Sequence, residues 1–107
     1  MTNKYTVGYA ITALEQLDEI ETFIIGEGEA NRAFSFTARI RAACESLNTF
    51  PSRYRKRDDI RDGLRVFGFE NRVTITYEID EQDFRVTILG IHYGGRNWES
   101  QYLQDGI

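Results

Sequence analysis

The sequence is poor in the residues that build metal sites and covalent cross-links. Among its 107 residues are one cysteine, Cys44, and one histidine, His92. A lone cysteine excludes an intramolecular disulfide and fits a reducing compartment. With a single histidine as well, the chain lacks the clusters of cysteine and histidine that hold zinc. We therefore expect no metal site and no other cofactor.

Long apolar runs are also missing. No run approaches the ~20 residues needed to cross a bilayer. The N-terminus lacks a basic segment leading into an apolar one, which is the pattern of a secretory signal. We therefore expect a cytoplasmic protein without membrane association. The length suits one domain, residues 1–107, with one modest core.

Lysine is scarce, and the positive charge is concentrated in one segment. The net charge is −4, yet residues 51–72 carry seven basic residues against four acidic ones. Such a patch on an acidic body suits an acidic peptide or a phosphate. Because Asp58, Asp59 and Asp62 alternate with the arginines, local ion pairs are an equally good interpretation. We expect no sequence-specific binding of nucleic acid by this chain alone.

The first half of the chain predicts a strand and two helices. Residues 5–10 have the β-branched and aromatic character of a short strand. Thr12, with Glu15 three residues later, predicts the start of a helix that ends near Gly26. A second helix is expected over residues 29–48, before Pro51. The apolar stripes predicted for the two helices contain Leu14, Leu17, Ile20, Ile24, Ile25, Ala30, Ala33, Phe34, Thr37, Ile40, Ala43, Cys44 and Leu47.

The second half predicts three strands, over residues 63–67, 72–79 and 84–93. The links between them are short enough for antiparallel hairpins. The fold class is therefore α+β, in the order β-α-α-β-β-β: an antiparallel sheet with an N-terminal helical hairpin packed on one face.

Few side chains suggest chemistry. Cys44 lies on an apolar helix face, so a buried structural thiol is favoured over a nucleophile. His92 has a side chain suited to acid or base catalysis, but no surrounding motif requires that role, so a structural or surface histidine is favoured. The aromatic residues of the last segment, Tyr93, Trp98 and Tyr102, pack either on the helices or on a partner, and packing on the helices is favoured.

Ordered motifs over residues 5–99 resemble the ParE branch of the ParE/RelE toxin superfamily. They are Ala13-x-x-x-Leu17-x-x-Ile20-x-x-Phe23-Ile24, Ala33-x-x-Phe36-x-x-x-Ile40, Cys44-x-x-Leu47, Phe50-Pro51, Gly63-Leu64-Arg65, the Tyr77 strand and Ile88-Leu89-Gly90-Ile91-His92-Tyr93-Gly94-Gly95-Arg96-Asn97. The resemblance implies the RelE/ParE-like fold and the toxin of a type II toxin-antitoxin system. It also implies inhibition of DNA gyrase, a block of replication, a role in plasmid stabilisation and silencing by a ParD-like antitoxin.

Two other functions stay open. RelE-like relatives share the fold and cleave mRNA on the ribosome with basic residues and a tyrosine or histidine. Here Lys56, Arg57, Arg65, Arg72, His92 and Tyr93 are the candidates for such a set. A chain with two lysines and a pI near 5.0 is a poor match to a protein that docks on ribosomal RNA. A non-toxic module that only binds its antitoxin is the second alternative. The gyrase inhibitor is favoured, with no catalytic residue.

Two sets of contact residues are predicted. Arginine and aromatic side chains are the usual anchors of protein interfaces. For the target we predict Arg65, Tyr93, Arg96 and Trp98. For the carboxylates of the antitoxin we predict Arg39, Arg41, Arg53, Arg57 and Arg61.

Overall fold

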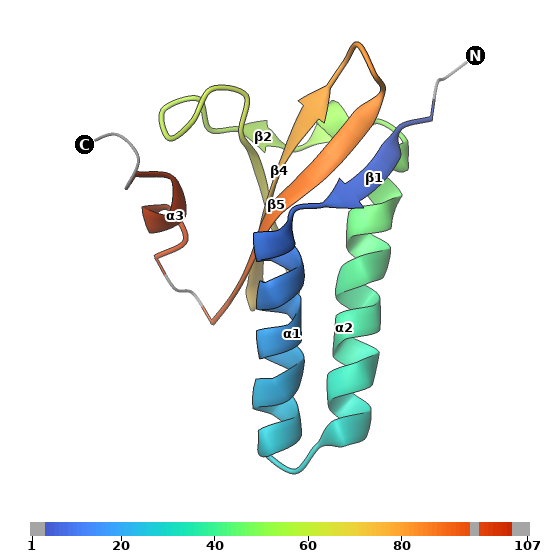
Figure 1. Ribbon diagram of the computed structural model, residues 1–107, viewed down its shortest axis with the longest axis vertical. Coiled ribbons are helices and arrows are strands. Elements are labelled where there is room, and N and C mark those ends of the chain that lie inside the picture. The colour runs from blue at the N-terminus through green and yellow to red at the C-terminus, as the bar shows by residue number, and fades with distance from the viewer. Residues whose placement is uncertain (1–3, 95–96, 104–107) are drawn as a thin grey trace.

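The computed structural model describes residues 4–94 and 97–103 and has the predicted α+β architecture. Figure 1 shows the two long helices side by side, as an antiparallel hairpin that extends beyond one end of the sheet. In chain order the elements are β1 (Thr6–Tyr9), α1 (Ile11–Gly26), α2 (Ala30–Glu45), the 3-10 turns η1 (Ser46–Asn48) and η2 (Pro51–Arg53), β2 (Arg55–Lys56), β3 (Arg65–Phe69), β4 (Val73–Asp80), β5 (Arg85–Tyr93) and α3 (Ser100–Leu103).

The five strands form one sheet in the order β1-β5-β4-β3-β2. The hairpins from β2 to β5 are antiparallel, as expected. The β1 strand instead runs parallel to β5, with Thr6 opposite Arg85 and Tyr9 opposite Ile88. The sheet is therefore mixed, which corrects the expectation of an antiparallel sheet at this one edge. A parallel pair requires a long crossover connection, and the segment containing the helical hairpin provides it.

The core lies between the helical hairpin and one face of the sheet. From the helices it takes Ala13, Leu17, Ile20, Ile24, Ala33, Phe36, Ile40 and Cys44, and from β3 to β5 it takes Phe67, Val73, Ile75, Tyr77, Val86, Ile88 and Ile91. The prediction of a buried Cys44 thiol is confirmed. Leu14, Ile25 and Phe34 were expected in the buried stripes but are 40%, 40% and 54% exposed. They project from the side of the hairpin that faces away from the sheet.

The first helix ends at Gly26 as predicted, but its start and the end of the second helix differ from the prediction. The α1 helix begins at Ile11 with Ala10 as its N-cap and without a side-chain capping bond, so the expected role of Thr12 and Glu15 is wrong. The N–H of Ala10 still bonds to the carbonyl of Ile88, and the chain therefore enters the helix directly from the β-ladder. The α2 helix ends at Glu45, where it tightens into the 3-10 turn η1.

Two short elements were missed by the sequence analysis. The β2 strand lies inside the basic segment and pairs Arg55 with Val66 and Lys56 with Arg65. The α3 helix includes Gln101 and Tyr102, for which no helix or strand was predicted. Both elements are shorter than the windows in which periodicity is detectable. They matter because they carry side chains of the candidate sites.

Candidate functional site

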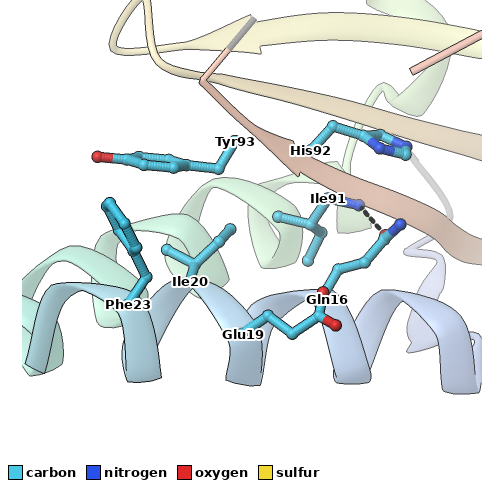
Figure 2. A pocket seen from close by; sticks show the side chains of 7 residues that line it. All are labelled: Gln16, Glu19, Ile20, Phe23, Ile91, His92 and Tyr93. Atoms are coloured by element: carbon cyan, nitrogen blue, oxygen red, sulfur yellow. Dashed lines mark hydrogen bonds between the residues drawn. The ribbon is translucent and has the colours of Figure 1, made fainter. Parts of the chain in front are cut away.

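A hollow of about 90 Å³ lies between α1 and the end of β5. Its walls are Gln16, Glu19, Ile20, Phe23, Ile91, His92 and Tyr93, shown in Figure 2. Ile20, Ile91 and the two aromatic rings make it largely apolar. A volume of this size accommodates several water molecules or one aliphatic side chain. We call this region the edge groove, defined by the seven residues above.

The edge groove follows a part of the β5 edge that pairs with no strand within residues 4–94 and 97–103. The β1 strand covers β5 only as far as Ile88. Beyond it, the amide of Gln16 accepts a hydrogen bond from the N–H of Ile91 at 2.8 Å. The amide of Gln101 donates to the carbonyl of Leu89 at 3.2 Å, and Gln16 donates to Gln101 at 3.3 Å. Two glutamine side chains therefore occupy hydrogen-bonding positions that a further strand would use.

Tyr93 forms the outer end of the edge groove within a row of aromatic rings. Its ring centroid lies 6.0 Å from that of Phe23 and 6.0 Å from that of Phe36. Phe23 is 53% exposed although it is large and apolar. An exposed aromatic beside a hollow and an open strand edge is typical of a binding surface.

His92 is held on the far side of β5. Figure 2 shows its imidazole pointing away from α1. Burial lowers its pKa below the usual value, so the ring is neutral at physiological pH. Its Nε2 atom is buried and has no hydrogen-bond partner within residues 4–94 and 97–103. The neighbouring Gly90 has no space for a side chain, since a Cβ there would lie 2.5 Å from His92 Nε2 and 2.9 Å from Thr76 Oγ1.

The basic segment is held in place by two of its own arginines. Arg65 donates to the carbonyls of Ser52 and Tyr54, at 3.0 and 2.7 Å. Arg53 donates to the carbonyl of Thr49 at 2.8 Å and to the hydroxyl of Ser46 at 2.9 Å. These bonds fix the backbone of the loop, and they occupy guanidinium groups that we predicted for the target and the antitoxin.

Trp98 packs against the same loop. The guanidinium of Arg57 lies 5.6 Å from the centre of the Trp98 ring, and Arg57 also forms a two-pronged ion pair with Asp59. Tyr102 packs on Trp98 and shares a short hydrogen bond with Thr76. The predicted residues Arg57 and Trp98 are therefore brought together, beside the exposed Arg55 and Lys56 of β2. We call Arg55, Lys56, Arg57 and Trp98 the basic platform.

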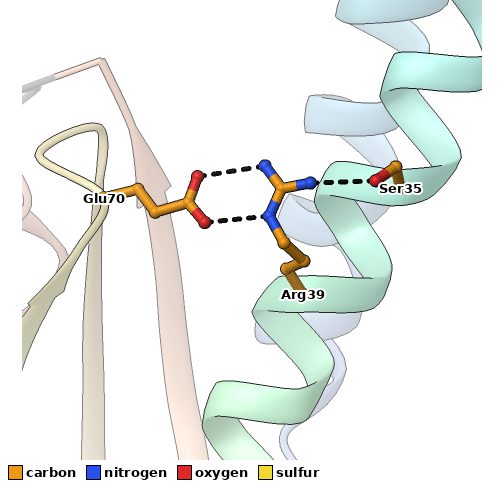
Figure 3. A network of polar contacts seen from close by, with 3 residues as sticks. All are labelled: Ser35, Arg39 and Glu70. Atoms are coloured by element: carbon orange, nitrogen blue, oxygen red, sulfur yellow. Dashed lines mark hydrogen bonds and ion pairs between the residues drawn. The ribbon is translucent and has the colours of Figure 1, made fainter.

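The other predicted arginines lie on different parts of the surface. Figure 3 shows Arg39 paired with Glu70 through both carboxylate oxygens, at 2.8 and 3.0 Å, with a further bond to Ser35. Arg61 pairs with Glu78 at 3.4 Å. Arg41 is exposed on α2, on the side of the hairpin away from the sheet. A single partner must wrap around the molecule to reach all five arginines of the antitoxin set.

The target set is only partly assembled. Tyr93 stands opposite Val73, whereas Arg65 stands opposite Tyr77, four residues along the same strand. That separation is roughly 13 Å, at ~3.3 Å per residue. Trp98 belongs to the basic platform, away from Tyr93, and Arg96 falls outside the described residues.

The candidate mRNA-cleaving set is divided in the same way. Lys56 and Arg65 pair at one end of the sheet, while Arg72 and Tyr93 lie at the other. Arg57 is bound to Asp59 and His92 points into the sheet face that α3 covers. In-line attack on a phosphate needs its base, acid and cations around one atom. The described geometry does not gather these six side chains around one centre.

The roles of Gln16 and Gln101 at the strand edge were not predicted from the sequence. Gln16 is a polar residue next to Leu17, which was predicted for the apolar stripe of the first helix, but that position alone does not indicate a bond to a strand. Its partner, the Ile91 amide, is identifiable only when the strand pairing is known. In residues 4–94 and 97–103, no three His, Cys, Asp or Glu side chains are grouped to hold a metal ion. Within the same residues no helix is long and apolar enough to span a membrane.

Two solved structures share the fold. A chain from the chromosomal ParDE toxin-antitoxin system of P. aeruginosa superposes with a TM-score of 0.73 and 15% identity, covering 87% of this chain and 99% of that chain. A chain from the RelBE2 toxin-antitoxin complex of Mycobacterium tuberculosis gives a TM-score of 0.57 and 21% identity, covering 87% and 94%. No curated protein sequence matches this chain.

The sequence itself matches a family over residues 7–98, from β1 to Trp98, shortly before α3. This range contains the edge groove and the basic platform. It also contains every motif on which the resemblance to ParE rested, and its fold agrees with that of the solved structures. The chain therefore belongs to the family of ParE toxins of the type II toxin-antitoxin system parDE.

Proposed function

We propose that this toxin inhibits DNA gyrase and that a ParD-like antitoxin neutralises it. The observation that carries the proposal is the presence of two separate exposed surfaces, the basic platform and the edge groove. One surface suits a large target, and the other suits an extended peptide. This arrangement lets an antitoxin segment and the target be recognised by separate surfaces, and Arg57 is the one platform residue that is also predicted to contact the antitoxin.

The basic platform is the proposed contact with gyrase. Inhibition by binding needs anchors and not a reaction centre, and arginine and tryptophan are enriched among such anchors. Arg57 is already oriented by Asp59 and Trp98, so little side-chain freedom remains to be lost on binding. Arg96 stays a predicted contact with gyrase. We propose that Tyr93 instead serves the edge groove, and that Arg65 supports the loop through its bonds to the carbonyls of Ser52 and Tyr54.

Supercoiling by purified gyrase tests this contact directly. We expect the full chain to inhibit supercoiling, and the Arg55→Glu/Lys56→Glu double variant to need at least about ten-fold more protein for the same inhibition. Arg85→Glu is the matched control, because Arg85 is an exposed arginine on β5, which β4 and β3 separate from β2. Full inhibition by the double variant would place the contact elsewhere, and no inhibition by the wild type would reject gyrase as the target.

The edge groove is the proposed seat of the antitoxin. An extended segment that adds to a sheet edge gains main-chain hydrogen bonds, and a neighbouring pocket selects one of its side chains. The bonds that Gln16 and Gln101 make to Ile91 and Leu89 are of the kind that an added strand replaces. An apolar side chain fits the hollow between Ile20 and Tyr93. Contacts of antitoxin carboxylates with Arg39, Arg41, Arg53, Arg57 and Arg61 stay a prediction.

Calorimetry with the protein encoded next to this gene tests the antitoxin site. We expect binding at micromolar concentration or tighter, and a loss of at least about ten-fold in affinity for Phe23→Asp. Phe34→Asp is a matched control, since Phe34 is 54% exposed against 53% for Phe23 but lies on α2. Equal affinities of the two variants would remove the edge groove from the site.

The two alternative functions have their own readouts. Primer extension on mRNA from cells expressing the toxin is expected to show no new codon-specific ends. Ends that disappear with His92→Ala or Arg72→Ala would support the RelE-like activity. A module that only binds its antitoxin would leave growth unchanged on induced expression, whereas we expect growth to stop.

A further inference from the structure

The helical hairpin has an outer face that no described part of the chain covers. A helix turns by 100° per residue, which places Leu14, Asp18 and Ile25 on one side of α1, away from the buried Ala13, Leu17, Ile20 and Ile24. On α2 the same analysis places Phe34 and Arg41 away from the buried residues. All five side chains are exposed. We call these five residues the outer face.

One hydrogen bond shows which residues of α1 and α2 lie at the same level along the hairpin. The hydroxyl of Thr37 on α2 donates to the carboxylate of Glu21 on α1 at 3.0 Å. Because the helices are antiparallel, Ile25 then lies level with the start of α2 near Phe34, and Asp18 lies level with Arg41. The outer face therefore carries an apolar pair near the hairpin tip and a pair of opposite charges in its middle.

The two charges do not satisfy each other within one molecule. Neither Asp18 nor Arg41 forms an ion pair or a side-chain hydrogen bond with another described residue. The neighbouring cations Arg32 and Arg39 have partners in Glu29 and Glu70. Each helix thus presents one charge of opposite sign to the outside, beside large apolar side chains that are also uncovered.

We propose that the outer face binds a second copy of this chain. A two-fold axis parallel to the seam between α1 and α2 places each α1 over the α2 of the other copy, at the same level. Asp18 then meets Arg41 of the other copy, and Ile25 meets Phe34. Every contact occurs twice, as an isologous interface requires. The product is a four-helix arrangement in which all adjacent helices are antiparallel.

The size of the outer face sets the expected strength. Two helices of 16 residues, each about 24 Å long, present roughly 500 Å² per copy, or about 1,000 Å² in total. Interfaces of about this area are at the weak and transient end of specific association. We therefore expect a dimer that forms at tens to hundreds of micromolar. This face has no residue in common with the edge groove or the basic platform and shares only Arg41 with the predicted antitoxin contacts, so the inference goes beyond the proposed function.

Sedimentation equilibrium of the purified full chain, without antitoxin, tests the inference by charge reversal. We expect the wild type to dimerise as its concentration rises, and Asp18→Arg and Arg41→Asp each to be at least about ten-fold weaker, because like charges then face each other. Mixing these two variants restores opposite charges at both contacts, since one copy then carries two arginines at these positions and the other carries two aspartates. The mixture is expected to form a one-to-one heterodimer, whereas each variant alone is expected to associate only weakly.

Controls make each outcome decisive. Glu19→Arg reverses a charge on the side of α1 that faces the edge groove and is expected to leave dimerisation unchanged. Phe34→Asp removes the apolar contact and is expected to give a monomer with the melting temperature of the wild type. A wild type that stays monomeric at all concentrations would overturn the proposal. So would a dimer that survives both charge reversals, or a mixture that fails to restore association.

Discussion

Gln16 on α1 and Ile91 on β5 are 75 residues apart in the sequence and joined by a hydrogen bond of 2.8 Å. The bond closes the helical hairpin onto the sheet at a position where β1 no longer covers β5. A helix side chain thus satisfies a backbone N–H that strand pairing leaves open. This single contact links the packing of the fold to the edge groove.

Replacement of Gln16 tests its contribution to stability. Gln16→Leu leaves the partly buried N–H of Ile91 without an acceptor, which is expected to lower the free energy of unfolding by about 1 to 3 kcal/mol. Urea denaturation measures the change, and hydrogen exchange at the Ile91 amide is expected to accelerate. Thr22→Leu, on an exposed position of the same helix, is the control. Equal stability of the two variants would show that water replaces the glutamine without cost.

Gly90 is expected to tolerate no side chain. A Cβ there meets His92 Nε2 at 2.5 Å, Thr76 Oγ1 at 2.9 Å and Gln101 Oε1 at 3.0 Å. Gly90→Ala must displace these groups, at an expected cost of about 1 to 3 kcal/mol in the free energy of unfolding. Gly8→Ala is the control, since a Cβ at that strand position meets nothing within 4 Å. Thermal melting of both variants checks the difference, and equal melting temperatures would contradict it.

Alkaline pH is expected to destabilise the fold through two buried acidic groups, the Cys44 thiol and the Tyr77 phenol. Burial raises the pKa of Cys44 to about 12 and that of Tyr77 to about 12, both above their ordinary values. In the unfolded chain these groups lose their protons near pH 9 and pH 10, so the unfolded state gains stability there while the folded state stays protonated. Stability is therefore expected to fall from about pH 9 upwards. Urea denaturation at pH 7 to 11 measures it.

Cys44→Ser and Tyr77→Phe isolate the contributions of these two groups, while the raised pKa values of Tyr9 and Tyr102 act in the same direction in every variant. Tyr77→Phe also removes the hydrogen bond from the tyrosine hydroxyl to the carbonyl of Pro51, so it lowers stability at every pH. Its fall between pH 9 and pH 11 is nevertheless expected to be smaller than that of the wild type. In the native protein the Cys44 thiol is expected to resist alkylation at pH 8, and to react once urea unfolds the chain. Rapid alkylation of the native protein would show that the thiol is accessible.

The sequence predicted the elements whose periodicity is long and whose composition is distinct. The two helices and the three long strands were located within a few residues, because buried residues such as Leu17, Ile40 and Ile75 recur at regular spacing. The parallel pairing of β1 was not predictable, since period-2 alternation is the same in parallel and antiparallel pairs. Leu14 and Phe34 were wrongly assigned to the buried stripes of the two helices. In a two-helix layer each helix buries a narrower stripe than the one its apolar residues span.

The candidate sites were less accessible to sequence reasoning. The cluster of positive charge was visible, but which arginines serve the fold depends on contacts with backbone carbonyls. Arg65 reaches the carbonyls of Ser52 and Tyr54, 13 and 11 residues away, which no local pattern reports. The pairing of Trp98 with Arg57 also depends on how the chain returns after β5.

Trp98 tests whether the basic platform is the toxic surface. Trp98→Ala removes the ring that packs on Arg57 and Tyr102, and it is expected to weaken gyrase inhibition by about 1 to 2 kcal/mol of binding, the usual size for an interface anchor. The variant must keep the melting temperature of the wild type for the result to be assigned to binding. Tyr93→Ala is the comparison, because Tyr93 was predicted for the same target from sequence but belongs to the edge groove.

The pair of variants separates the two surfaces that this toxin exposes. Trp98→Ala is expected to reduce gyrase inhibition while antitoxin affinity, measured by calorimetry, stays within about two-fold of the wild type. Tyr93→Ala is expected to do the opposite, because its ring closes the hollow beside Phe23. If Tyr93→Ala lost gyrase inhibition and Trp98→Ala kept it, the end of β5 would be the toxic surface. The basic platform would then be left with a structural role, as support for the loop that Arg53 and Arg65 hold.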